Sequence, residues 1–298
     1  MTMRRRSNTR PLILPILAIL SLAWLGWRQS HQPKTMIDRS TAIACLSMET
    51  LDAYQAQAST PAFATLHPIP RKADTDPLLG TMIRFRVTGG ADANAYFVPA
   101  KKQSKKWLLV IQEWWGLNEN IKQEADKYFK ALGEYNVLAI DMYDGRVAAT
   151  PDSAMKIMRS ADMNRMTSIV RAAMDHAGEK ASIYSVGWCF GGMWSLQTAI
   201  LAGEKGKGSV MFYGRPETDI EKLKSIRCDV IGFFGTRDRS PSPAMVDGFE
   251  RTMADLGKSL TVHRYDAGHG FSNPSNPNFN QDATEDSFAK AVAFLTTH

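Results

Sequence analysis

Residues Gly187-Trp188-Cys189-Phe190-Gly191-Gly192, "GWCFGG", place a single cysteine between glycines inside an otherwise apolar run. A cysteine that only fills space packs as a small hydrophobe on any regular backbone and needs no glycines around it. The stretch follows a strand-like run at 181–187 and precedes a helix-like run at 192–203. It therefore has the strand–turn–helix pattern of a nucleophile elbow, with sulfur in place of the usual serine oxygen.

The glycines of this turn have a predicted steric role. Gly187 and Gly191 keep its flanks free of side chains, so we expect the thiol of Cys189 to stand exposed at the edge of a sheet. The N-terminus of the following helix favours the thiolate form of that cysteine. Cys189 is the candidate nucleophile, and the alternative is a glycine-flanked cysteine of the core.

Strand and helix patterns alternate on both sides of the turn. Residues 81–88 and 94–100 predict an antiparallel pair of strands. Further strands are predicted at 106–112, 136–141, 208–214, 229–235 and 260–266, and further helices at 119–132, 151–177, 243–257 and 284–296. Repeated alternation of this kind predicts an α/β fold with a mostly parallel central sheet and helices on both faces.

Two later strand ends supply partners for the cysteine. Chemistry in such a sheet belongs at the carboxyl ends of the strands. Asp238 follows the strand at 229–235, and His269 follows the strand at 260–266. The order nucleophile, acid, histidine is that of the α/β-hydrolases. Taken singly, Asp238 could cap a turn and His269 could be an ordinary loop histidine.

Five motifs together resemble the dienelactone hydrolases, also called carboxymethylenebutenolidases. They are "QEWWGLN" (112–118), "DMYDG" (141–145), "GWCFGG" (187–192), "GTRD" (235–238) and "GHGFSNP" (268–274), and the resemblance runs from about residue 78 to the C-terminus. It implies an α/β-hydrolase fold and a cysteine hydrolase of esters or lactones. It also implies Cys189, Asp238 and His269 as the catalytic triad, with Glu113 near the nucleophile, where it helps to generate the thiolate.

The surroundings of Glu113 agree with that role. A carboxylate at the end of an apolar strand beside two tryptophans is desolvated, which raises its affinity for a proton. It could take the thiol proton and leave His269 to protonate a leaving group. The alternative is an ion pair between Glu113 and a loop arginine. The backbone N–H groups of Trp114 and Phe190 are the expected oxyanion donors.

Aromatic residues near the motifs predict an apolar or aromatic substrate pocket. The expected substrate-binding residues are Trp115, Tyr143, Arg146, Trp188 and Phe271. The dienelactone binders of the family carry an arginine shortly after the catalytic histidine, whereas this sequence has Asn273, which points away from dienelactone itself. Because a thiolate leaves easily, the expected substrates are esters, lactones and thioesters rather than amides.

The N-terminal segment has the pattern of a membrane anchor. The net charge of +6 lies within residues 1–40, and residues 41–298 are balanced, so nothing supports nucleic-acid binding. Residues 11–27 are uncharged and follow an arginine cluster; as a helix they would span about 25 Å. We expect an inner-membrane, single-pass signal anchor with the catalytic domain on the periplasmic side. The alternative is a cleaved signal and secretion.

The expected organisation has three parts. They are a basic tip and transmembrane anchor at 1–27, a linker and N-terminal arm at 28–77, and the hydrolase domain at 78–298. Three cysteines do not suggest a disulfide scaffold, and Cys45 and Cys228 are interpreted as incidental and as strand packing.

We expect no cofactor and no metal, because no ligand cluster of suitable spacing and no phosphate loop stand in the sequence. The expected partners are the membrane and a small ester or lactone. Two other functions are open: a non-catalytic, membrane-tethered binding module on the same fold, and a thioesterase, acyltransferase or peptidase. The sequence carries no signal of the oligomeric state.

Overall fold

The computed structural model describes residues 53–54, 56–58, 60, 63–64, 67–71 and 76–298. The predicted anchor at 11–27 and Cys45 lie outside these residues. Within them, no helix combines the length and the apolar character that a bilayer crossing requires.

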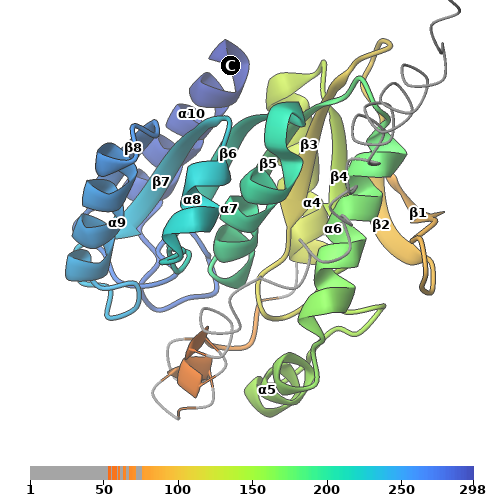
Figure 1. The fold of residues 1–298 in the computed structure, drawn as a ribbon. Coiled ribbons are helices and arrows are strands. Elements are labelled where there is room, and N and C mark those ends of the chain that lie inside the picture. Colours follow the sequence, from red (N-terminus) through yellow and green to blue (C-terminus); the bar gives the residue numbers. More distant parts are fainter. Residues whose placement is uncertain (1–52, 55, 59, 61–62, 65–66, 72–75) are drawn as a thin grey trace, which may run out of the picture. The chain divides into compact units, whose positions relative to one another are not determined.

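One eight-stranded sheet forms the centre of the domain, in the order β1-β2-β4-β3-β5-β6-β7-β8 (Figure 1). The strands are β1 (Thr81–Phe85), β2 (Ala93–Val98), β3 (Lys106–Ile111), β4 (Asn136–Ile140), β5 (Ser182–Trp188), β6 (Gly206–Phe212), β7 (Asp229–Gly235) and β8 (Leu260–Tyr265). β2 pairs antiparallel with β1 and β4, and every other pair is parallel. The predicted hairpin and the mostly parallel sheet are therefore confirmed.

Helices cover both faces of the sheet. They are α4 (Glu119–Leu132), α5 (Pro151–Arg159), α6 (Met163–Ala177), α7 (Phe190–Ala202), α8 (Ile220–Ser225), α9 (Pro243–Asp255) and α10 (Gln281–Thr297), with a 3₁₀ turn, η3 (Gly203–Lys205). α6, α7 and α8 lie in front of the sheet in Figure 1, and α4 and α10 lie behind it. This layering agrees with the predicted α/β fold.

Two helix predictions need correction. The single helix expected at 151–177 is two helices, because Asp162 accepts a hydrogen bond from the backbone N–H of Asn164 and caps a new helix there. The short helix α8 was not predicted, and it is capped in the same way by Asp219. The helix expected from 192 begins at Phe190, directly after Cys189.

The turn between β5 and α7 consists of Cys189 alone, with φ 56° and ψ −115°. A Cβ atom on Gly187 would lie 2.1 Å from the carbonyl oxygen of Gly191, and one on Gly191 would lie 2.2 Å from that of Ile111. A Cβ atom on Gly192 would lie 2.6 Å from the carbonyl oxygen of Phe212. The first turn of α7 is therefore packed directly against the backbone at the ends of β3 and β6, which confirms the steric role predicted for the glycines.

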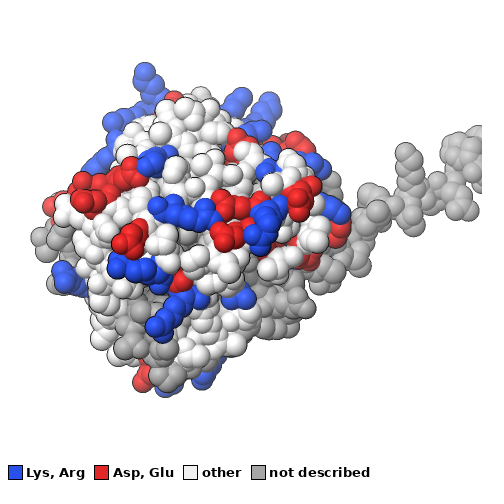
Figure 2. Space-filling model, turned by 90° about the vertical axis from the view of Figure 1, so that its left-hand side faces the viewer, with Lys and Arg blue, Asp and Glu red and all other residues white. Residues whose placement is uncertain are grey.

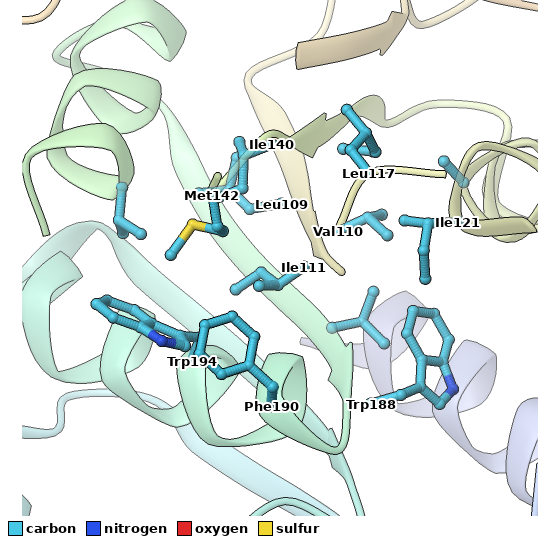
Figure 3. Close-up of a cluster of buried hydrophobic side chains, with 14 of the residues drawn as sticks. Leu109, Val110, Ile111, Leu117, Ile121, Ile140, Met142, Trp188, Phe190 and Trp194 are labelled. Atoms are coloured by element: carbon cyan, nitrogen blue, oxygen red, sulfur yellow. The ribbon is translucent and has the colours of Figure 1, made fainter. Parts of the chain in front are cut away.

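Residues on either side of Cys189 anchor the turn in the core (Figure 3). Phe190 and Trp194 point toward Met142 and Ile111, whereas Trp188 lies on the side of Ile121. These side chains are buried, and α7 is apolar on nearly all sides. A helix of that composition is stable only inside a protein, so the turn is held from both faces of the sheet.

We predict that Gly191→Ala lowers the free energy of unfolding by about 3 kcal/mol or more, because its Cβ would collide with backbone atoms that cannot rotate away. Urea denaturation measures the change. Gly248→Ala is the control: Gly248 lies in α9 with only a side-chain atom of Arg251 near its Cβ position, at 3.9 Å. The free energy of unfolding of this control should rise by about 0.5 to 1 kcal/mol, because alanine is a better helix former than glycine. Equal stabilities of the two variants would contradict the packing described for the turn.

Candidate active site

Three strand ends bring Cys189, Asp238 and His269 together. The Sγ atom of Cys189 lies 3.2 Å from Nε2 of His269. Nδ1 of His269 lies 2.8 Å from Oδ2 of Asp238, whose other carboxylate oxygen accepts from the backbone N–H of Ser240. The sulfur, the imidazole and the carboxylate thus form a continuous hydrogen-bonded chain.

The charge state of His269 follows from these neighbours. Burial alone would lower the pKa of the imidazole, but the Asp238 carboxylate, the Cys189 sulfur and the hydrogen bonds to both raise it well above its ordinary value. The ring therefore carries a proton near neutral pH. This positive charge lies beside the sulfur of Cys189, because Nε2 of the ring faces Sγ at 3.2 Å.

The thiol of Cys189 is covered, so the expectation of an exposed thiol is wrong. Cys189 is only 2% exposed. The hydroxyl of Tyr54 lies 3.3 Å from its sulfur, and Nε2 of His67 lies 3.5 Å from it. Both residues belong to the N-terminal arm. The ring of Phe63, also in the arm, stacks on His67 and packs edge-on against Trp114, which attaches the arm to the end of β3.

His67 is a second imidazole at the sulfur that the sequence did not single out. Its Nδ1 lies 2.7 Å from the carbonyl oxygen of Phe63, and because a carbonyl can only accept, Nδ1 carries the hydrogen. The unprotonated Nε2 therefore faces Cys189. Burial and the positive charge of His269 lower the pKa of His67 to about 3, so the ring is neutral. The only local signal is the "PAFATLHPIP" stretch, in which apolar residues and this histidine interrupt a polar arm.

Glu113 lies at the end of β3, where burial raises its pKa to about 7 against the opposing effects of His269 and Asn273. This is the direction expected from the sequence. Its Oε2 accepts a hydrogen bond of 2.9 Å from the amide of Asn273, so its partner is an amide and not the loop arginine considered as the alternative. Near neutral pH this carboxylate can exchange a proton.

The two backbone amides expected as oxyanion donors are those of Trp114 and Phe190. Phe190 is the first residue of α7, so its N–H has no carbonyl within the helix. Trp114 lies in the turn after β3, the strand whose end packs against Gly191. Within the described residues, neither N–H donates a hydrogen bond.

The predicted substrate-binding residues occupy different places. Trp188 and Glu113 line a cavity of about 460 Å³, with Tyr213, Ser272 and Asn273 on its walls. Figure 3 shows Trp188 on the side of the sheet opposite Phe190. A second cavity of about 820 Å³ is lined by His67, Asp238 and His269 among others. Asp238 and His269 thus line the second cavity and not the first, and Cys189 lines neither.

Four further predicted residues lie outside those cavities. Tyr143 is buried with its ring 5.6 Å from that of Phe190, and its hydroxyl has no hydrogen-bond partner in the described part of the chain. The buried rings of Trp115 and Phe271 pack on Trp114 and Tyr213. Arg146 is exposed and donates to the carbonyl of Tyr143 and to Ser160. Their roles in substrate binding stay predictions.

The face of the molecule shown in Figure 2 carries charges of both signs. Figure 2 shows lysine and arginine side chains interspersed with aspartate and glutamate on the displayed face. Surface ion pairs such as Arg264–Asp247, at 2.7 Å, and Arg165–Asp144, at 2.6 Å, follow from this mixture. The displayed face thus lacks the single-sign surface that nucleic-acid binding requires.

Comparison with known proteins identifies relatives of this arrangement. The family model described as "Dienelactone hydrolase family" matches residues 93–298. The protein usf of Aquifex pyrophilus is 26% identical over 230 residues, which cover 73% of this chain and 98% of that protein. Carboxymethylenebutenolidase 1 of Cupriavidus pinatubonensis is 22% identical over 232 residues, covering 73% of this chain and 97% of the relative.

A solved structure supports the same fold. A dienelactone hydrolase-like promiscuous phosphotriesterase from metagenomic libraries superposes with a TM-score of 0.62 at 21% identity, over 74% of this chain and 98% of that one. This likeness establishes the α/β-hydrolase fold. Together with the family match over most of the chain, it confirms the resemblance read from the five motifs: the chain belongs to the dienelactone hydrolase family.

Proposed function

We propose that this protein hydrolyses esters or lactones through Cys189 as nucleophile, with His269 and Asp238 as its partners. The observation that carries the proposal is the 3.2 Å separation between Sγ of Cys189 and Nε2 of His269, whose other nitrogen lies 2.8 Å from Asp238. A non-catalytic binding module would be preferred if the cysteine and the histidine were too far apart to interact, and they are in contact.

The proposed reaction has two halves. The thiolate attacks the carbonyl carbon, and the developing oxyanion accepts hydrogen bonds from the backbone N–H groups of Trp114 and Phe190, each worth about 3 kcal/mol of barrier. His269 then protonates the departing alkoxide, which leaves a thioester on Cys189. Water, deprotonated by His269, hydrolyses the thioester and restores the thiolate.

Glu113 is proposed as the acceptor for the thiol proton. Its pKa of about 7 allows it to take and return a proton near neutrality. The amide of Asn273 fixes the orientation of the carboxylate, and the oxygen of that amide is held in turn by the backbone N–H of Ser275. Asn273 is thus proposed as a positioning residue for Glu113.

Access to the sulfur requires movement of the arm in this proposal. Tyr54 and His67 occupy the approach to Cys189, so both have to withdraw before a carbonyl carbon can reach it. The cavity lined by Glu113, Trp188 and Tyr213 is the candidate pocket for the substrate, since an aromatic wall beside a few polar groups suits a small ester or lactone.

We predict that Cys189→Ala lowers hydrolysis of p-nitrophenyl acetate by the full-length chain about 1000-fold or more, because it removes the nucleophile. Release of p-nitrophenol measures the rate. Cys228→Ala is the matched control, since Cys228 lies just before β7 and packs beside Gly206, and it should keep the activity. Equal rates for the wild type and Cys189→Ala would contradict the proposed function.

The raised pKa of Glu113 predicts a pH dependence of stability. Between its ordinary value of 4.5 and about 7 the folded chain holds a proton that the unfolded chain has lost, so stability falls as pH rises through this window. Glu113→Gln removes this pH-dependent fall in stability, because glutamine does not titrate. We expect the free energy of unfolding of the variant, relative to the wild type, to increase by about 3 kcal/mol from pH 4.5 to 7. Parallel profiles in urea titrations would show that Glu113 does not keep its proton.

We further propose that residues 11–27 anchor the chain in the inner membrane, with the hydrolase domain on the periplasmic side. The support is the arginine cluster before an uncharged apolar run. Extraction of membranes with alkaline carbonate should leave the full-length chain in the pellet, whereas a chain that begins at residue 40 should be soluble. Release of the full-length chain into the supernatant would contradict the anchor and favour a cleaved signal.

A further inference from the structure

Three ligand atoms that could hold a metal ion converge at the nucleophile. They are Sγ of Cys189 and the Nε2 atoms of His67 and His269, and all lie within 4.8 Å of one another. All three residues are buried, and they come from the arm, the turn before α7 and the loop after β8. The proposed reaction uses only two of them and gives His67 no task.

The separations match those expected around zinc. With Zn–S near 2.3 Å and Zn–N near 2.05 Å, sulfur and nitrogen ligands of a tetrahedral ion lie about 3.6 Å apart. Nε2 of His67 is 3.5 Å from Sγ, and Nε2 of His269 is 3.2 Å from it. The two Nε2 atoms lie within 4.8 Å of each other, and a tetrahedral ion would hold them about 3.3 Å apart, so side-chain shifts bring the two rings to the ion.

Both imidazoles are also held as zinc-binding histidines usually are. A metal-bound histidine almost always gives its other ring nitrogen to a carboxylate or a backbone carbonyl, which fixes the tautomer and the ring orientation. Nδ1 of His269 pairs with Asp238, and Nδ1 of His67 pairs with the carbonyl of Phe63. Each Nε2 is thereby directed at the sulfur.

We propose that His67, Cys189 and His269 bind one zinc ion. Thiolate and imidazole are ligands that Zn²⁺ prefers, and three protein ligands leave one coordination position open. The hydroxyl of Tyr54, 3.3 Å from Sγ, lies beside the sulfur on the arm side. On binding, the proton shared by the sulfur and Nε2 of His269 leaves to solvent, and the ion takes its place.

The zinc-bound protein is inactive as a cysteine hydrolase. The ion occupies the electron pairs of the thiolate and of His269 that the reaction needs. It also ties the arm to the turn through His67, which closes the approach to the sulfur. The site does not depend on the proposed hydrolysis, because binding is measured without substrate.

The test uses the purified, metal-stripped full-length chain. Cd²⁺ replaces Zn²⁺ as a probe, because Cd–thiolate bonds give an ultraviolet charge-transfer band, and competition by Zn²⁺ then gives its affinity. We expect one equivalent of Cd²⁺ and a band that Cys189→Ser abolishes, although that variant keeps Cys45 and Cys228. His67→Ala and the bulkier His67→Gln should each weaken Zn²⁺ binding at least about 100-fold. Loss of an outer-shell partner costs up to about 100-fold in metal affinity, and loss of a direct ligand should cost at least as much. The exposed His176→Ala is the matched control and should bind normally.

Each alternative outcome would overturn the zinc site. An undiminished Zn²⁺ affinity in both His67 variants would exclude His67 as a ligand. A charge-transfer band that survives in Cys189→Ser would show that another cysteine binds the metal. Ester hydrolysis separates the two proposals. Zn²⁺ should inhibit the wild type, and a chelator should restore its activity. Inhibition of the His67 variants should need a Zn²⁺ concentration at least about 100-fold higher. Zinc binding without any hydrolysis would remove the proposed function alone. Hydrolysis that saturating Zn²⁺ leaves unchanged would remove the zinc site alone.

Discussion

The close approach of backbone to backbone around Cys189 is the constraint on which the site depends. With no room for a Cβ atom at Gly187, Gly191 or Gly192, the first turn of α7 lies against the ends of β3 and β6. That contact holds Cys189 at φ 56°, a left-handed conformation that costs a residue other than glycine about 1 to 3 kcal/mol. The buried α7 stabilises this conformation. As a consequence of this conformation, the sulfur of Cys189 and the backbone amide of Phe190 both lie at the edge of the sheet.

Electrostatics then distinguishes two imidazoles that touch the same sulfur. The rings of His67 and His269 lie 5.1 Å apart, yet the pKa of His269 is raised and that of His67 is lowered. The difference lies in the partner of Nδ1: in His269 it is the Asp238 carboxylate, whereas in His67 it is the uncharged carbonyl of Phe63. Burial is the larger cause of the lowered pKa of His67, and the positive charge of His269 adds to it, so His67 stays neutral.

Local patterns explain what could be predicted from the sequence. The glycines around Cys189 and the positions of Asp238 and His269 after strands are signals within a few residues, and their convergence follows from a parallel sheet. The break between α5 and α6 was missed because apolar periodicity continues across it and Asp162 looks like any surface aspartate. His67 and Tyr54 were missed because they contact Cys189 across 122 and 135 residues. A contact of that span leaves no pattern in one sequence.

The loops that carry Asp238 and His269 also hold the arm. The side chain of Gln57 accepts a hydrogen bond from Ser240, two residues after Asp238, and the backbone N–H of Arg71 donates to Ser275, in the loop that follows His269. These polar contacts are partly exposed, so each contributes little, and burial of Tyr54 and Phe63 supplies most of the arm's attachment. The arm is therefore held mainly by the non-directional packing of its aromatic rings over Cys189.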